Sequence, residues 1–239
     1  MATKRQLEKY RPFGVKGYVY SGSGSISVIG KICNSEGWKK LLLVIDPGVL
    51  AAGGADSIIK TVEAAGLEYK IFSEIKPTPL QVDIETIGFP MYQEFGADAI
   101  IAVGGGSAMD SAKGIAMMGD SGKTIDELEK ILFALDPHVA TPWHTFPMIC
   151  IPTTFGTGSE VIRNAVISDV TGHKLVPMHD CILPAYAIED PDLMATLPAH
   201  VAAATAMDAL VQAIESYVSR AATEFSELCA LHAIELIGP

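Results

Sequence analysis

Short apolar runs alternate with helical patterns over most of the chain. The runs are residues 41–45, 69–72, 99–103 and 148–151. Helical spacing is found at about 55–65, from the loop 76–79 to about 95, and at 107–118. Near-continuous apolar strands separated by helices are typical of a parallel sheet that is covered on both faces. The pattern therefore predicts an α/β fold.

The pattern changes near Asp190, after which strand-like runs disappear and alanine-rich helical spacing takes over. A first helix is predicted from about Thr196, which is suited to capping, with Pro198 in the first turn. A second helix is predicted at about 223–237. We therefore expect an α/β domain at 1–190 and the beginning of an all-helical domain at 191–239.

Composition excludes several classes of protein. The 239 residues carry 17 basic and 28 acidic side chains, a formal charge of −11, which argues against nucleic acid or an anionic membrane surface as a partner. The four cysteines are far apart, which is typical of reduced thiols in an intracellular protein. The N-terminus lacks an apolar signal segment, and no apolar run approaches the roughly 18 residues of a membrane helix. We expect a soluble, cytoplasmic protein.

Three consecutive glycines, 104–106, follow the strand predicted at 99–103 and open onto a helix. Such a turn brings bare main chain and the positive end of a helix close to a ligand, which suits a pyrophosphate. Gly105, Gly106 and Ser107 are the candidate phosphate-binding residues. The alternative is structural: Ser107 and Asp110 have the spacing of a capping box, and the glycines then only permit a tight turn.

Asp46 directly follows the apolar run 41–45. A carboxylate there can accept hydrogen bonds from an adenosine ribose and would repel a 2′-phosphate, which favours NAD over NADP. In the usual dinucleotide fingerprint, however, the glycines precede the acidic residue by about 20 positions, whereas here Asp46 precedes Gly104. Taken alone, Asp46 is better explained by an ordinary Asp-Pro turn.

The strand predicted at 148–151 leads into a segment rich in hydroxyls and glycines, which includes Thr153, Thr154 and Thr157. Small donors of this kind suit phosphate or ribose oxygens. The carboxyl edge of the strands is also where open α/β sheets hold their ligands. The segment therefore favours ligand binding over its alternative, a plain threonine-rich turn.

Asp208 and Gln212 lie four residues apart, on one face of a predicted helix. An aspartate followed by a histidine at this spacing would be half of a divalent-metal site. The amide oxygen of Gln212 is a poorer ligand for Fe²⁺ or Zn²⁺ than an imidazole. On spacing alone, a solvated Asp208 is the favoured interpretation.

Together, these segments resemble the iron-containing (group III) alcohol dehydrogenases. The resemblance covers essentially the whole chain and rests on Gly104–Ser107 with Asp110 and Lys113, on 152–160, on Asp190-Pro191 with Leu197-Pro198, and on 205–215. It implies a nucleotide-binding α/β domain followed by a helical domain, and hydride transfer between NAD(P) and a small alcohol or aldehyde. It also implies a divalent metal that polarises the carbonyl oxygen.

Carried over position by position, the resemblance implies that Asp46 contacts the adenosine ribose and that Gly106 and Ser107 hold the pyrophosphate. Asp208 matches a metal-ligand carboxylate. Further cofactor contacts are implied for Gly105, Asp110, Thr153, Thr154, Thr157, Asn164 and Lys174.

The sequence departs from the family pattern in its expected metal ligands. Gln212 stands where the family has its first ligand histidine, and the other two ligand histidines would follow Pro239. A lesser change is Thr78, where many members have an asparagine beside the adenine. If the chain is whole, we expect weak or absent dehydrogenase activity.

Two further alternatives stay open at this point. One is an NAD-binding protein that no longer transfers hydride; the other is the related fold of glycerol dehydrogenases and dehydroquinate synthases, which match the hydroxyl-rich segment less well.

The helices after about Thr196 would leave an apolar face exposed, which predicts a homo-oligomer or the docking of a partner.

Overall fold

The fold was obtained as a computed structural model, which describes residues 17–195 and 197–238. These residues form two compact units: one comprises 17–153 and 158–195, and the other comprises 154–157 and 197–238. Thr196, which was expected to cap the first C-terminal helix, lies outside the described residues. The division into domains at 1–190 and 191–239 stays a prediction.

The first unit is built on a six-stranded sheet in which every neighbouring pair of strands is parallel. Its strands are β1 (Tyr18–Ser21), β2 (Lys40–Ile45), β3 (Glu68–Phe72), β4 (Ala99–Gly104), β5 (Met148–Pro152) and β8 (Tyr186–Glu189). The four predicted strands are confirmed as β2, β3, β4 and β5. The apolar pattern missed β1 and β8, because both are only four residues long and Tyr18 and Val19 of the edge strand β1 are exposed.

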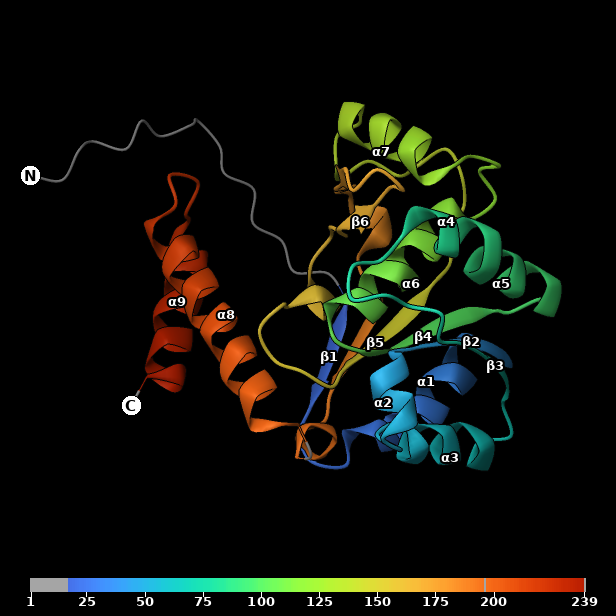
Figure 1. Ribbon diagram of the computed structural model, residues 1–239, viewed down its shortest axis with the longest axis horizontal. Helices are drawn as coiled ribbons and strands as arrows, with labels where there is room; N and C mark the ends of the chain where they lie inside the picture. The colour runs from blue at the N-terminus through green and yellow to red at the C-terminus, as the bar shows by residue number, and fades with distance from the viewer. Residues whose placement is uncertain (1–16, 196, 239) are drawn as a thin grey trace, which may run out of the picture. The chain divides into compact units, whose positions relative to one another are not determined.

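Helices cover both faces of this sheet, as the α/β pattern predicts (Figure 1). One face carries α1 (Ile29–Glu36), α2 (Pro47–Ala51) and α3 (Asp56–Ala64); the other carries α4 (Gln81–Asp83), α5 (Phe89–Phe95), α6 (Gly106–Met118) and α7 (Ile125–Ala134). The helix predicted up to about residue 95 is confirmed as α4 and α5, joined by the short π-helix η2 (Ile84–Gly88). Shorter elements are η1 (Ser25–Val28), η3 (Ser159–Val161), η4 (Asp180–Ile182), η5 (Pro191–Met194) and a hairpin of β6 (Ile167–Ser168) and β7 (Lys174–Leu175).

Strand β2 shows how the two faces form the core. Leu42 and Val44 pack on the face of α5, α6 and α7, whereas Leu41, Leu43 and Ile45 pack on the face of α1 and α3. All five side chains are fully buried. A strand that is buried on both faces must be apolar at every position, which is why the run 41–45 has no alternation.

The strand order β1-β8-β5-β4-β2-β3 places a reversal of direction between β2 and β4. From β2 the chain passes outward to β3, then returns across β2 to β4 and continues on the other side. In open α/β sheets the crevice at such a reversal, beyond the carboxyl ends of the strands, is where ligands bind. Asp46 follows β2 and Gly104 ends β4, so two of the candidate residues flank this point.

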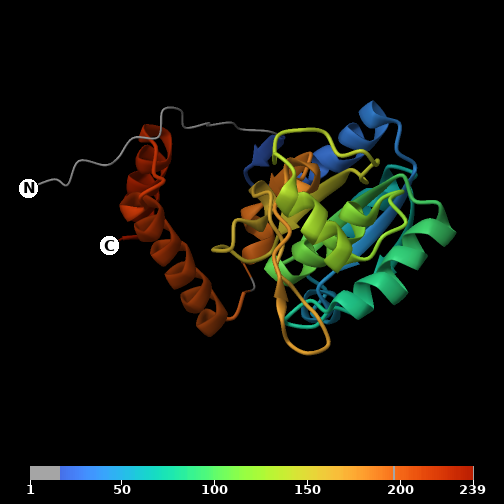
Figure 2. The same cartoon turned by 90° about the horizontal axis from the view of Figure 1, so that it is seen from above.

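The second unit contains two helices that pack side by side in both views, α8 (Ala199–Val218) and α9 (Glu224–Ile237) (Figure 1 and Figure 2). Pro198 immediately precedes α8 with an extended ψ of 137°, so it lies one position before the predicted first turn. The second predicted helix is confirmed as α9, which Thr223 caps in a capping box with Ser226. Among the described residues no helix is both long enough and apolar enough to cross a membrane.

Candidate nucleotide-binding site

The ends of three neighbouring strands meet at the carboxyl edge of the sheet. The main-chain N–H of Asp46 donates to the oxygen of Val103 at 2.9 Å, and that of Thr153 donates to the oxygen of Gly104 at 3.0 Å. Asp46, Gly104 and Thr153 therefore lie side by side on β2, β4 and β5. The structure brings together three segments that are far apart in the sequence.

Gly104 is at the centre of this group and needs to be glycine. Its φ of +148° is one that residues with a side chain rarely adopt, and an added Cβ would lie 2.8 Å from Cβ of Asp46 and 2.9 Å from Cβ of Ala108. The absence of a side chain lets β4 turn directly into α6 beside the end of β2.

Helix α6 starts at Gly106 with Gly105 as its N-cap, and no side chain caps its first N–H groups. The proposed capping box of Ser107 and Asp110 is therefore wrong, because Ser107 is already inside the first turn and its hydroxyl donates to the oxygen of Pro77 at 2.6 Å. A 13-residue helix whose first turn has no side-chain cap presents main-chain donors and a positive dipole end. This is the geometry that binds phosphate groups.

Asp46 is more than part of a turn. Pro47 and Gly48 begin α2, and the Asp46 side chain caps it: Oδ1 accepts from the N–H of Gly48 at 2.8 Å and of Val49 at 3.1 Å. The explanation by an Asp-Pro turn is thus corrected, since proline at the first helical position and aspartate at the N-cap start a helix. Among the described residues no donor binds Oδ2, which is left as an acceptor at the reversal point.

The hydroxyl of Thr153 is a buried polar group at the same edge of the sheet. The residue is 4% exposed, and among the described residues Oγ1 has no hydrogen-bond partner. Buried polar groups are nearly always satisfied, so an unpaired hydroxyl beside a bare helix terminus points to a ligand or water that completes it.

Two of the other candidates meet around a cavity of about 580 Å³. Thr78 reaches it from the loop after β3, and Lys174 reaches it from β7. Lys76 also lines the cavity and forms an ion pair with Asp83 at 3.2 Å. Lys76 and Thr78 flank Pro77, whose main-chain oxygen accepts the hydrogen bond from the Ser107 hydroxyl. This cavity therefore adjoins the start of α6.

Asp110 points away from the glycine turn. Its Oδ1 accepts from the hydroxyl of Ser159 at 2.7 Å, and its Oδ2 accepts from the N–H of Val166 at 2.9 Å. Lys113, on the next turn of α6, is fully buried and donates to Ser159 Oγ at 2.9 Å and to the main-chain oxygen of Asn164 at 2.8 Å. Sequence reasoning gave Lys113 no role, although a D-x-x-K pair in an otherwise apolar helix signals a buried ion pair.

Burial shifts the pKa of Asp110 and of Lys113 in the directions that favour their uncharged forms. It lowers the pKa of Lys113 below its ordinary value of 10.5, an effect partly offset by Cys150, Asp110 and Glu160. It raises the pKa of Asp110 above 3.8, although Lys113 and the hydrogen bonds from Val166 and Ser159 act in the opposite direction. The hydrogen bonds therefore lower the cost of burying these charges without removing it.

Thr154 and Thr157 belong to the second unit, where the loop 154–157 contacts α8. Gln212 Nε2 donates to the main-chain oxygen of Gly156 at 3.0 Å, and an added Cβ on Gly156 would lie 3.2 Å from Oδ2 of Asp208. Asp208 and Gln212 thus face the same loop. Within residues 17–195 and 197–238, no three His, Cys, Asp or Glu side chains lie close enough to hold a metal ion, so the donors described here do not fit a metal site.

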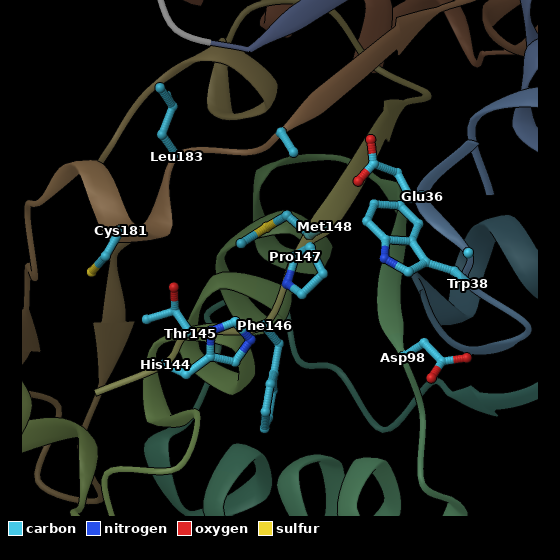
Figure 3. A pocket seen from close by; sticks show the side chains of 12 residues that line it. Glu36, Trp38, Asp98, His144, Thr145, Phe146, Pro147, Met148, Cys181 and Leu183 are labelled. Carbon is cyan, nitrogen blue, oxygen red and sulfur yellow. The ribbon is translucent and has the colours of Figure 1, made fainter. Parts of the chain in front are cut away.

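A different cavity, of about 530 Å³, lies at the opposite edge of the sheet, where β2, β4 and β5 begin (Figure 3). Its acidic groups already have protein partners. Glu36 accepts from the Tyr186 hydroxyl at 2.6 Å, and Asp98 accepts from the N–H groups of Lys39 and Lys40. None of its lining residues starts an α-helix, because in a parallel sheet the helices start at the carboxyl edge. The candidate site is therefore at the glycine turn.

A doubly wound parallel sheet with a glycine turn at its reversal point defines an α/β nucleotide-binding fold. Residues 17–191 match the family model of iron-containing alcohol dehydrogenase, and residues 202–239 match that of the Fe-containing alcohol dehydrogenase family, C-terminal. The chain belongs to the iron-containing alcohol dehydrogenase family. The family predicted from the sequence is thus confirmed.

The relatives include alcohol dehydrogenase 4 of Schizosaccharomyces pombe, 32% identical over 95% of this chain and 52% of the relative. The NAD-dependent methanol dehydrogenase of Bacillus methanolicus is 35% identical over 91% of this chain and 55% of the relative. A crystal structure of 1,3-propanediol oxidoreductase superposes with a TM-score of 0.86 at 33% identity, covering 96% of this chain and 58% of that one. The chain spans about half the length of the curated relatives it matches.

Proposed function

We propose that this chain is the NAD-binding part of an oxidoreductase that transfers hydride between NAD and a small alcohol or aldehyde. The observation that carries the proposal is the uncapped N-terminus of α6, at the reversal point of the sheet, beside the buried and unpartnered hydroxyl of Thr153. The NAD dependence of the related methanol dehydrogenase supports it.

Residues of the first unit would bind the diphosphate, the adenosine ribose and the adenine of the dinucleotide. The main-chain N–H groups of Gly106 and Ser107 would bind the diphosphate, and the Thr153 hydroxyl would donate to the same ligand. Oδ2 of Asp46 would accept from the adenosine ribose, and its charge would repel a 2′-phosphate. The cavity lined by Thr78 and Lys174 would receive the adenine end.

The overall reaction removes a hydride and a proton from an alcohol and yields an aldehyde. NAD supplies the acceptor of the hydride when it is bound. The residues described here position the dinucleotide and bind its negative charge. Asn164, whose main chain is fixed by Lys113, would contribute a further contact on the same edge.

The family name implies iron, but Asp208 and Gln212 supply only a carboxylate and an amide. The Gln212 nitrogen is directed at the oxygen of Gly156, since a carbonyl can only accept a hydrogen bond. This contact favours a second candidate function, which is NAD binding without hydride transfer by the chain alone.

Calorimetric titration of the purified chain with NAD⁺ and NADP⁺ tests the binding function. We expect NAD⁺ to bind more tightly than NADP⁺. Asp46→Asn should reduce this difference in affinity, because asparagine keeps the helix cap but loses the charge that repels the 2′-phosphate. Absence of heat with either nucleotide from a folded sample would refute the proposal. Oxidation of NADH by an aldehyde then separates the two candidates: turnover supports the dehydrogenase, and binding without turnover supports the second.

A further inference from the structure

The pair Asp110 and Lys113 links two segments of the site that the sequence separates by about fifty residues. Helix α6 contributes its N-terminus to the glycine turn, and one or two turns later it contributes these two side chains to the segment Ser159–Val166. Because positions four and seven residues after Gly106 share a face of the helix, both side chains point to that segment.

The contacts form one continuous hydrogen-bonded path. The Lys113 ammonium donates to the Ser159 hydroxyl, and that hydroxyl donates to Oδ1 of Asp110, which itself lies 4.0 Å from Nζ. The remaining bonds go to main chain: Lys113 donates to the oxygen of Asn164, and Val166 donates to Asp110. The segment is thus fixed at three points by two side chains of α6.

The burial of the pair argues against direct ligand contact. Lys113 is completely inaccessible, and the Asp110 side chain is 15% exposed with hydrogen bonds to both of its oxygens. A cation that neutralised the diphosphate would have to reach the N-terminus of α6. This ammonium is instead bound by the Ser159 hydroxyl and by the main-chain oxygen of Asn164.

We propose that Asp110 and Lys113 are positioning residues, which hold the segment Ser159–Val166 against α6 and thereby fix the main chain of Asn164, the further nucleotide contact proposed above. Neither side chain touches the nucleotide. This inference rests on the proposed NAD site for its effect on affinity, while the attachment of the segment to α6 is independent of any ligand.

Two measurements on Lys113→Met test it: the dissociation constant for NAD⁺, and hydrogen–deuterium exchange of peptides covering 159–166. We expect the variant to bind NAD⁺ at least tenfold more weakly and the 159–166 amides to exchange at least tenfold faster, while peptides of β2 and β4 keep their protection. Lys130→Met is the matched control, because Lys130 forms an exposed pair with Asp126 at 3.3 Å on α7 and should change neither readout.

Ser159→Ala provides a milder test if the methionine variant does not fold, since it removes only the hydroxyl between the two charged groups. The same local rise in exchange, with weaker NAD⁺ binding, is expected. Unchanged exchange at 159–166 in the variants would overturn the inference, and weaker binding with unchanged exchange would mean that Lys113 contacts the nucleotide. If the wild-type chain fails to bind NAD⁺, the proposed function fails, and the exchange data still decide whether the pair holds the segment.

Discussion

Gly104 lies against the side chain of Asp46 across the reversal point of the sheet. A Cβ added to Gly104 would lie 2.8 Å from that of Asp46, closer than real Cβ contacts come. The end of β4 can therefore approach the end of β2 only because residue 104 has no side chain. This close approach brings the start of α6 next to the candidate ribose acceptor.

Gly104→Ala is expected to destabilise the first unit. The φ of +148° and the contacts with Asp46 and Ala108 together predict a loss of about 2–5 kcal/mol in the free energy of unfolding. Thermal unfolding measures this loss. Gly66→Ala is the control, because Gly66 also has a positive φ, +70°, but no atom within 4 Å of the added Cβ, so only backbone strain of about 1 kcal/mol is expected. Equal losses in the two variants would contradict the close contact.

Thr153→Val should separate stability from nucleotide affinity. Valine removes a buried hydroxyl that has no partner among the described residues, so the melting temperature is expected to stay or to rise. If the hydroxyl donates to a diphosphate, NAD⁺ affinity falls by about tenfold or more, as for a hydrogen bond to a charged group. Thr153→Ser keeps the hydroxyl and should keep the affinity. Unchanged NAD⁺ binding by the valine variant would exclude this contact.

Lys113→Met should make stability more sensitive to pH. Burial raises the folded-state pKa of Asp110 above 3.8, so at pH values between 3.8 and the folded-state pKa the folded protein binds more protons, and stability falls as the pH rises. Because Lys113 lowers that pKa, its removal raises the pKa further and extends this range upward. Glu160, which also faces Lys113 and has a pKa raised by burial, adds to the effect.

We therefore expect the difference in melting temperature between wild type and Lys113→Met to be larger at about pH 7.5 than at about pH 4.5. Lowering the pH favours protonation of Asp110, whose pKa is raised by burial, and so reduces the cost of the buried unpaired charge. A difference that is equal at both pH values would show that the lost hydrogen bonds, and not the charge on Asp110, determine the cost.

Gln212→His should raise the affinity of the chain for Zn²⁺ or Co²⁺. A histidine four residues after Asp208 on α8 can place a ring nitrogen beside the carboxylate and donate its other N–H to the oxygen of Gly156, which Gln212 now contacts at 3.0 Å. Calorimetric titration with the metal should show that the variant binds it at least tenfold more tightly than the wild-type chain does. Asp208→Ala in the same background should abolish the gain, and a gain that survives this change would refute the paired site.

The chain is expected to self-associate through α9. Phe225, Leu228 and Leu236 are 57%, 67% and 73% exposed, and exposed apolar groups on one helix favour association. Light scattering with Leu228→Glu tests this, and Phe133→Glu on α7 is the control, since Phe133 is 88% exposed but lies in the first unit. A monodisperse monomer of the wild-type chain would contradict the expectation.

The sequence by itself determined the α/β class, the strands β2, β3, β4 and β5, and the start of α6. The strands β2, β4 and β5 were the clearest, because residues buried on both faces of a parallel sheet must be apolar in continuous runs. It also placed candidate ligand-binding residues directly after the ends of strands, where glycines, prolines and hydroxyl side chains form turns. The short edge strand β1 stayed invisible, since Tyr18 and Val19 are exposed and create no such run.

Only the tertiary structure decided which of these residues act together. That Asp46, Gly104 and Thr153 are neighbours follows from the order of the strands, which local sequence does not encode. The sequence also could not predict that Ser107 donates to Pro77 while Asp110 accepts from Ser159. A hydroxyl or a carboxylate can form a hydrogen bond with any suitable group that packing brings within reach. Periodicity specifies which side of an element is buried, whereas long-range packing determines the partner of each buried polar atom.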